Sequence, residues 1–187
     1  MSADRCYVLY VLLRQALNSD GDVFECGVYR GGTACLFAEI LRRRGSSKKL
    51  FLFDTFDGMP EADPAKDIHM RGDFADTSKE KLEKELRSIG MLKRCEIRKG
   101  LIPDTFRGLE SNAIAFAHVD VDLYASVWDS LAFIWPKISI GGFLVIDDYG
   151  FPTCPGAKSA TDDFFADKPS VPLCLPTGQA IVFKGVS

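Results

Sequence analysis

Residues Asp22 to Thr33, DVFECGVYRGGT, decide how the rest of the chain is organised. Val23, Phe24 and Cys26 form a short apolar run that carries one acid, Glu25, and a glycine-rich turn follows. The next segment, Ala34 to Leu41, is helix-forming and apolar on one face. A strand, a glycine turn and a helix in this order often open the nucleotide site of an α/β protein. Glycines let backbone N–H groups approach a ligand, and a helix N-terminus favours negative charge.

The glycine spacing separates two kinds of nucleotide site. The pattern from Glu25 to Gly32 is ExGxxxGG, so the G-x-G-x-x-G fingerprint of dinucleotide-binding proteins is absent. An acid at the strand end followed by this turn looks more like the first motif of S-adenosylmethionine-dependent methyltransferases. The alternative is a tight turn without a ligand, with Thr33 near the helix start. The acid at Glu25 makes that alternative the less favoured one.

The composition predicts an ordinary globular protein. The chain has 187 residues, of which 47% are hydrophobic and 26% charged, which suits a single domain over residues 1–187. The net charge is −3 at pH 7, and the sequence has no block of Lys and Arg. We therefore expect no nucleic-acid partner.

The cysteines and the N-terminal segment indicate in which cellular compartment the protein is expected and whether it is expected to contact a membrane. The six cysteines form no CxxC pair and the chain has two histidines, so no zinc site is predicted. Scattered cysteines suit a reducing compartment, which predicts a cytoplasmic protein. The apolar run from Cys6 to Leu13 is too short to span a bilayer. We expect no membrane partner, and an amphipathic helix over about residues 4–17.

Apolar runs and turn residues predict alternating strands and helices along the rest of the chain. After the opening strand, strands are expected at Leu50–Phe53, Cys95–Lys99, Ile114–Val119 and Phe143–Ile146, then a hairpin of Val171–Leu175 and Ala180–Phe183. Helices are expected up to Arg44, from a Thr77–Glu80 capping box to Gly90, over Ala125–Trp135 and over Gly156–Asp167. This order implies an α/β fold with five strand–helix units in a mostly parallel seven-strand sheet. The closing hairpin places one antiparallel strand near the sheet edge.

The segment from Glu61 to Asp76 has no periodicity and mixes glycine, proline and both signs of charge. A loop of this length in a compact domain usually covers a site, so residues 61–76 are predicted to form a lid. We expect it to become ordered over a ligand, with Arg71 and Phe74 touching that ligand.

Acids gather where the predicted strands end: Glu25, Asp54, Asp120, Asp122, Asp147 and Asp148. Ligands of open α/β sheets bind beyond the carboxyl ends of the strands. Carboxylates from adjacent strand ends suit a hard divalent cation, so Asp120, Asp147 and Asp148 are predicted to bind Mg²⁺. The alternative is a set of separate turn and cap residues in solvent. A D-x-D and a D-D at consecutive strand ends arise less easily by chance.

Asp54 and His118 have competing interpretations. At the end of the second strand, Asp54 lies where nucleotide-binding folds place an acid that accepts both ribose hydroxyls. The alternative is an Asp that caps the next turn, near Thr55 and Asp57. The ribose role is favoured. His118 lies within the fourth strand, opposite to Val119, and is expected to be a hydrogen-bonded core residue rather than a base.

Six motifs in order resemble one family: ECGVYRGG, FDTFDGMP, GDFADTS, HVDVDLY, GGFLVIDDYG and CPGAKSA. Together they are similar to the macrocin O-methyltransferase (TylF-like) family, which includes sugar methyltransferases of macrolide and aminocoumarin biosynthesis. The similarity runs from about Gly21 to the C-terminus. It implies a class I methyltransferase (Rossmann-like) fold with helices on both faces of the sheet. It also implies dependence on S-adenosylmethionine and Mg²⁺.

The resemblance implies roles for individual residues as well. The cofactor residues would be Glu25, Gly27, Tyr29, Gly31, Gly32, Thr33, Asp54, Phe56, Ser78 and Gly100. The glycine turn would hold the methionine part and Asp54 the ribose, while Phe56 and Ser78 would lie near the adenosyl group. Ser78 is equally explained as a helix cap. Asp120, Asp147 and Asp148 match the family's metal ligands, and Asp120 would also serve as, or position, the general base.

The predicted function is Mg²⁺-dependent methyl transfer to a hydroxyl of a small-molecule acceptor, with a natural-product sugar as one acceptor class. One alternative is a catalytically silent module that binds the cofactor. Another is an NAD or nucleotide-sugar oxidoreductase, although the chain lacks both G-x-G-x-x-G and Y-x-x-x-K. Family members usually have a longer N-terminal region that helps cover the acceptor. The acceptor pocket is therefore not predicted, nor is the oligomeric state, for which a homo-oligomer is one option.

Overall fold

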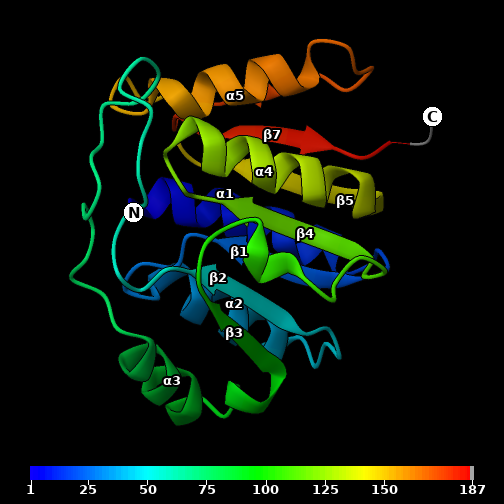
Figure 1. Ribbon diagram of the computed structural model, residues 1–187. Helices are drawn as coiled ribbons and strands as arrows, with labels where there is room; N and C mark the ends of the chain where they lie inside the picture. Colours follow the sequence, from blue (N-terminus) through cyan, green and yellow to red (C-terminus); the bar gives the residue numbers. More distant parts are fainter. Residues whose placement is uncertain (186–187) are drawn as a thin grey trace.

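The strands form one sheet in an order that places β1 and β4 side by side. The computed structural model describes residues 1–185. Its strands are β1 (Asp22–Cys26), β2 (Leu50–Asp54), β3 (Cys95–Lys99), β4 (Ile114–Val119), β5 (Ile138–Ile146), β6 (Leu173–Cys174) and β7 (Ala180–Phe183). They lie in the order β3-β2-β1-β4-β5-β7-β6 (Figure 1), with β1 to β5 parallel and β7 antiparallel to β5 and β6. The predicted mostly parallel seven-strand sheet with its closing hairpin is confirmed.

Helices cover both faces of the sheet and make three layers (Figure 1). The helices are α1 (Ala3–Ala16), α2 (Gly32–Arg43), α3 (Lys79–Ser88), α4 (Tyr124–Ile134) and α5 (Pro155–Phe165). Leu9 of α1, Phe37 of α2 and Leu82 of α3 belong to one buried cluster, and Leu131 of α4 and Phe164 of α5 to another. Within residues 1–185, no helix combines the length and the apolar composition that crossing a membrane requires.

Strand residues alternate between these two layers, and the alternation decides where each polar side chain lies. In β1, Phe24 packs with the α4–α5 layer, whereas Val23 packs with α1 and α2. Glu25 shares the face of Val23, because side chains two residues apart on a strand point the same way. His118 of β4 lies on this face too, since its ring meets the Phe37 ring edge-on at a centroid distance of 5.7 Å.

Strand β5 is longer than the sequence predicted. It begins at Ile138 rather than Phe143, and the glycine pair interpreted as a lead-in turn lies inside the strand. A Cβ on Gly142 would lie 2.7 Å from the carbonyl oxygen of Ala115, so a residue without a side chain allows β5 to approach β4 here. The glycine pair therefore marks close packing of two strands.

The segments around α3 and before β4 also differ from the prediction. The N-cap of α3 is Ser78, which confirms the helix-cap interpretation of Ser78 but not the capping box beginning at Thr77, and the Ser78 hydroxyl accepts from the Lys81 N–H at 3.3 Å. Thr77 instead donates to the carbonyl oxygen of Tyr29. Between β3 and β4 the chain forms a 3-10 turn at Asp104–Phe106 in place of an α-helix. One of the five expected strand–helix units therefore has no helix.

Gly27 joins three strand ends at the carboxyl edge of the sheet. Its φ is +82°, and a Cβ there would lie 1.8 Å from the carbonyl oxygen of Asp120. The Gly27 N–H donates to the Phe53 carbonyl at 2.9 Å, and the Asp120 N–H donates to the Cys26 carbonyl at 2.8 Å. The ends of β2, β1 and β4 therefore meet where the glycine turn begins.

The close approach at Gly27 predicts a position that tolerates no side chain. Gly27→Ala should lower the free energy of unfolding by at least about 2 kcal/mol, because it adds a backbone clash to left-handed strain. Gly32→Ala is the matched control, since no atom lies within 4 Å of its added Cβ. Urea denaturation without ligand measures both. Equal stability of the two variants would contradict the argument.

Candidate active site

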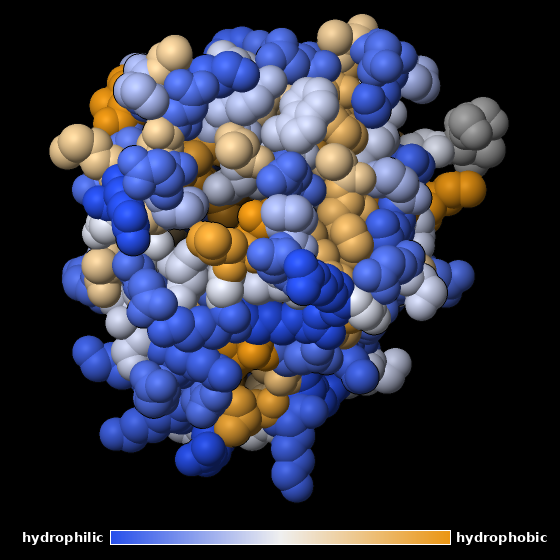
Figure 2. All heavy atoms as spheres, viewed as in Figure 1, coloured by the Kyte–Doolittle hydropathy of each residue, from blue (hydrophilic) through white to orange (hydrophobic). Residues whose placement is uncertain are grey.

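A cavity of about 620 Å³ opens at the carboxyl ends of β1, β2 and β4. Figure 2 shows the face on which it opens, with apolar side chains exposed in a hollow that polar residues surround. Six predicted site residues line it: Gly27, Tyr29, Asp54, Gly100, Asp120 and Asp148. The other predicted residues lie outside this lining: Glu25, Gly31, Gly32, Thr33, Phe56, Ser78 and Asp147.

Asp54 organises the glycine turn as well as facing the cavity. Its Oδ2 accepts hydrogen bonds from the N–H groups of Val28 at 2.7 Å and Tyr29 at 2.8 Å. Its Oδ1 accepts from the Phe56 N–H at 2.7 Å. A carboxylate has about four acceptor sites, so these three bonds leave little capacity for further donors. The capping role weighed against the ribose role is present, and the ribose role stays a prediction.

Glu25, His118 and Asp147 form a buried polar chain across three adjacent strands. All three are fully buried. His118 Nδ1 lies 3.2 Å from Glu25 Oε1, and His118 Nε2 lies 3.3 Å from Asp147 Oδ1. Gln179 Nε2 donates to the same Asp147 oxygen at 2.7 Å. The expectation that His118 is a hydrogen-bonded core residue agrees with this geometry.

Burial sets the protonation of this chain of groups. Desolvation raises the pKa of Glu25 to about 8, although a hydrogen bond from Thr33 opposes it. Desolvation lowers the pKa of His118 to about 4. Near neutral pH, Glu25 is therefore protonated and His118 is uncharged. If Nδ1 accepts from the Glu25 carboxyl, the imidazole keeps its proton on Nε2, which faces Asp147.

Arg5 of α1 supplies a positive charge to this buried group. Its guanidinium pairs with Asp147 Oδ2, and 17% of its side chain is exposed. The guanidinium also lies over the Phe151 ring, 4.7 Å from the centroid. Arg5 was not among the predicted site residues, because a single Arg near a helix start gives no signal in the sequence. Its role depends on the packing of α1 near the end of β5.

Asp120, Asp122 and Asp148 form an acidic group beside this chain. Burial raises the pKa of all three carboxyls, and repulsion among them raises those of Asp120 and Asp148 further. The Arg5 charge opposes the shift in each case. Carboxylate oxygens are the donors that a hard divalent cation prefers. The residues present therefore fit Mg²⁺.

The two consecutive aspartates after β5 do not share one environment. Asp147 faces α1, where it pairs with Arg5, whereas Asp148 lines the cavity. Asp148 Oδ2 accepts the Asp122 N–H at 3.2 Å. One ligand atom each from His118, Asp120 and Asp147 lies within 4.8 Å of the others. Metal binding by Asp120, Asp147 and Asp148 thus stays a prediction, with Asp120 between the other two aspartates.

Several predicted cofactor residues have structural roles in the part of the chain described. Phe56 is buried in the core under α2, Ser78 caps α3, and Gly31 packs against Leu82. Thr33 lowers the pKa of Glu25. These positions support the glycine turn from behind, so their contacts with a cofactor stay predictions.

The loop predicted as a lid lies along the rim of the cavity. Phe74 lines the cavity and meets the Tyr29 ring edge-on at a centroid distance of 5.5 Å. Asp67 Oδ1 accepts from the Tyr124 N–H at 2.9 Å, at the start of α4. Arg71 points to solvent, 3.8 Å from Glu61. The geometry places Phe74, but not Arg71, where a ligand would sit.

A larger hollow of about 800 Å³ lies at the opposite, amino-terminal end of the sheet. The end of α1 and the turn between α2 and β2 form it, and Arg14, Arg44 and Lys48 give it a positive lining. It contains neither the glycine turn nor the acids. We therefore place the active site in the smaller cavity.

Residues 9–172 match the family described as macrocin-O-methyltransferase (TylF). The chain belongs to this family. It is 32% identical over 158 residues to demethyldecarbamoylnovobiocin O-methyltransferase of Streptomyces niveus, covering 80% of this chain and 60% of that protein. It is 31% identical over 146 residues to the 8-demethyl-8-(2,3-dimethoxy-alpha-L-rhamnosyl)-tetracenomycin-C 4'-O-methyltransferase of Streptomyces olivaceus, covering 73% and 56%. The chain thus spans between 56% and 60% of the length of these two relatives.

Solved structures agree with membership of the TylF family. The structure of the O-methyltransferase NovP has a TM-score of 0.87 and 28% identity, covering 97% of this chain and 80% of that one. The calicheamicin methyltransferase CalS11 has a TM-score of 0.82 and 24% identity, covering 98% and 79%. The latter likeness supports the fold alone. The expected class I methyltransferase fold is confirmed.

The buried carboxyl of Glu25 predicts a decline of stability with pH. Between about pH 4.5 and 8 the folded protein binds the Glu25 proton and the unfolded chain does not, so stability falls as pH rises. His118 makes stability rise with pH between about pH 4 and 6.5, which offsets the effect of Glu25 in that range. The net decline in stability is therefore expected between about pH 6.5 and 8. Glu25 contributes up to about 1.4 kcal/mol per pH unit.

Glu25→Gln should reduce that decline, because the amide cannot ionise. Urea denaturation at the two ends of this pH range measures it, and Glu83→Gln on the exposed side of α3 is the matched control. The same decline in wild type and Glu25→Gln would show that Glu25 is ionised in the folded protein.

Proposed function

We propose that this protein transfers a methyl group from S-adenosylmethionine to a hydroxyl of a small molecule, with a natural-product sugar as the favoured acceptor class. The observation that carries the proposal is one cavity that contains both the glycine turn and the acidic group, in a member of the TylF family. The relative of Streptomyces olivaceus is named for methylation of a rhamnosyl-tetracenomycin, which supports a sugar acceptor.

The cofactor would lie along the ends of β1 and β2. The glycine turn from Gly27 to Thr33 would hold the methionine part, because Gly27 and Tyr29 of this turn line the cavity. Asp54 would reach the ribose with the acceptor capacity that its three backbone bonds leave. Gly100, which also lines the cavity, would let the adenosyl group approach the backbone.

Asp120 is the proposed general base. In the transfer, the acceptor oxygen forms a bond to the methyl carbon, the sulfur–carbon bond breaks, and neutral S-adenosylhomocysteine leaves. The acceptor hydroxyl must lose its proton as this occurs. Burial raises the pKa of Asp120 and makes its carboxylate a stronger base than an exposed one. Its place in the cavity lets it take the proton directly.

Asp120, Asp147 and Asp148 would hold Mg²⁺. When bound, Mg²⁺ would lower the pKa of a sugar hydroxyl, which is otherwise a poor nucleophile. The acidic group orients the acceptor, and Phe74 with the rest of residues 61–76 would exclude water as a lid.

We further propose a single domain over residues 1–187 in the cytoplasm, acting without nucleic acid or membrane, and a homo-oligomer as one possible assembly.

A cofactor-binding module without turnover is the competing function. The contact between Arg5 and Asp147 favours it, because a guanidinium already neutralises one of the proposed metal ligands. Transfer of a labelled methyl group to a panel of sugars and glycosides, with and without Mg²⁺, separates the two functions. Product that requires Mg²⁺ supports the methyltransferase, and no product with any acceptor supports the silent module.

Asp54→Ala should weaken S-adenosylmethionine binding by about 1.5–3 kcal/mol, since it removes hydrogen bonds to a charged group. It should also destabilise the free protein, because the Val28 and Tyr29 N–H groups lose their acceptor. Asp57→Ala is the control, as that exposed side chain pairs with Lys99. Calorimetry measures affinity, and denaturation measures stability. Binding of NAD with no binding of S-adenosylmethionine would exclude the proposed cofactor.

Asp120→Asn should abolish turnover while leaving S-adenosylmethionine affinity nearly unchanged, because the base is needed only for the chemical step. Mg²⁺ affinity, measured by calorimetry, should fall in the same variant. Asp129→Asn is the matched control, since Asp129 lines the cavity but lies outside the acidic group. Full activity of Asp120→Asn, or full wild-type activity in excess EDTA, would contradict the mechanism.

A further inference from the structure

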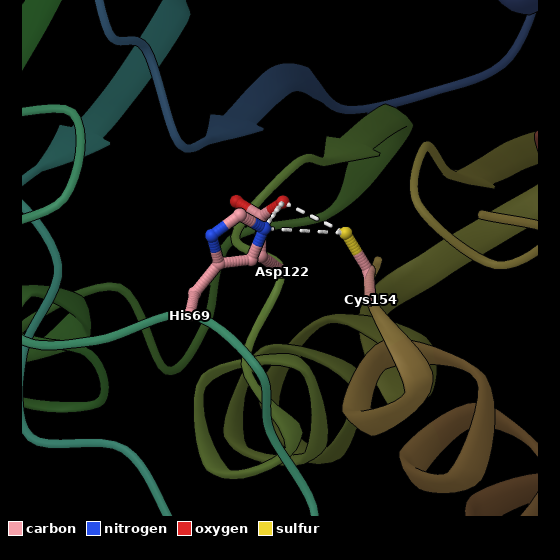
Figure 3. Close-up of side chains that lie close together, drawn as sticks. All are labelled: His69, Asp122 and Cys154. Atoms are coloured by element: carbon pink, nitrogen blue, oxygen red, sulfur yellow. Dashed lines mark hydrogen bonds and ion pairs between the residues drawn. The ribbon is translucent and has the colours of Figure 1, made fainter. Parts of the chain in front are cut away.

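A second cluster of potential metal ligands lies in the same cavity, apart from the proposed Mg²⁺ ligands. His69, Asp122 and Cys154 come from the loop after β2, from the segment between β4 and α4, and from the start of α5 (Figure 3). Their side chains converge on one point. Cys154 Sγ lies 3.1 Å from Asp122 Oδ1 and 3.8 Å from His69 Nε2, and the His69 and Asp122 atoms are 3.9 Å apart.

These three distances match the edges of a metal coordination tetrahedron. Zinc binds sulfur at about 2.3 Å and nitrogen or oxygen at about 2.0–2.1 Å, which puts tetrahedral ligand atoms about 3.3–3.6 Å apart. The observed separations lie within about 0.6 Å of these values, a shift that small side-chain rotations supply. All three residues line the cavity, so a fourth position would open towards it. Three protein ligands with one open position are typical of a non-structural zinc site.

Neighbouring groups already orient each ligand. His69 Nδ1 lies 3.2 Å from Asp73 Oδ2, which leaves Nε2 directed at the cluster, and a carboxylate on the second nitrogen is the usual partner of a metal-binding His. Asp73 is itself fixed by the Met70 N–H at 3.0 Å. Asp122 has a left-handed backbone with φ +56°, which separates its side chain from that of Asp120 two residues earlier. Cys154 is buried, at the N-cap of α5.

The local charge favours a cation. Burial raises the pKa of the Cys154 thiol, and the charges of Asp148 and Asp122 raise it further, so the thiol stays protonated when no cation is present. Cation binding would displace that proton to solvent and compensate the buried Asp122 charge. A thiol and an imidazole are poor ligands for Mg²⁺ and good ones for softer metals. The thiol of Cys154 and the imidazole of His69 therefore distinguish this site from the proposed Mg²⁺ ligands Asp120, Asp147 and Asp148, although Asp122 also belongs to the acidic group.

We propose that His69, Asp122 and Cys154 bind a thiophilic divalent cation of the Zn²⁺ type. The local spacing of Cys and His predicted no zinc site. Here the outer ligands are 85 residues apart and meet only in the folded chain. Occupation ties the loop after β2 to the segment after β4 and to the start of α5, and holds the proposed lid against the cavity. The proposal does not depend on the methyltransferase function, since it needs neither cofactor nor acceptor.

Co²⁺ is the probe, because a thiolate bound to Co²⁺ gives a charge-transfer absorption that Mg²⁺ and carboxylate sites do not give. The whole protein is titrated with Co²⁺ in excess Mg²⁺, so that hard-ligand sites are filled. We expect this absorption to saturate at a single equivalent and to disappear when Zn²⁺ is added. The expected proton release is one per cation, measured with a pH indicator in weak buffer.

Cys154→Ser should abolish the absorption, and Cys174→Ser, which changes an exposed cysteine, should leave it unchanged. His69→Ala lies on a loop and keeps the fold, so it tests the site even if Cys154→Ser does not fold. It should weaken Co²⁺ binding by at least the roughly 10–100-fold that loss of an outer-shell partner causes. Absence of the thiolate absorption in wild type would overturn the proposal and leave a hydrogen-bonded cluster only. Its persistence in Cys154→Ser, or unchanged affinity in His69→Ala, would also overturn it.

Discussion

Buried negative charge at the carboxyl edge of the sheet is the constraint on which the rest of this structure depends. Glu25, Asp147 and Asp148 have at most 5% of their surface exposed, and Asp120 lies beside them. An uncompensated buried carboxylate is costly, so each must be protonated, paired or hydrogen-bonded. Glu25 is neutralised by a proton, and Asp147 is compensated by Arg5 and Gln179. This leaves Asp120 and Asp148 as the acids with most to gain from a cation.

The same constraint explains the place of α1. Arg5 lies on α1 and pairs with Asp147 at the end of β5. Helix α1 packs against this part of the sheet, in the buried cluster that also contains Phe116 and Val145. The helix therefore contributes to the electrostatics of the site as well as to the core. Because Arg5 opposes the pKa shifts of Asp120, Asp122 and Asp148 together, it acts as a shared counter-ion for the whole edge. A divalent cation bound to these aspartates would compensate the same negative charge that Arg5 compensates. Metal binding would then be linked to the contact between Arg5 and Asp147, and so to the position of α1.

Asp54 shows why two interpretations of one residue need not exclude each other. The sequence offered a ribose ligand or a turn cap, and the carboxylate does cap the turn through Phe56 while also holding Val28 and Tyr29. A carboxylate with several acceptor sites can fix a loop and still face a ligand cavity. If Asp54 binds the ribose as proposed, its backbone bonds already hold it in place, and little side-chain entropy would be lost when a ligand arrives.

The sequence by itself determined the elements and their order, because strand and helix periodicity, apolar runs and glycine turns are local properties. It also placed Asp54, Asp120 and Asp148 at one edge, since parallel strands end together, and its motifs indicated the TylF family. Tertiary structure alone decided the rest. The alternation of successive residues along a strand turned Asp147 towards α1 and Asp148 towards the cavity. Arg5, and the meeting of His69 with Asp122 and Cys154, required segments far apart in sequence to pack together, and no local pattern encodes such distances.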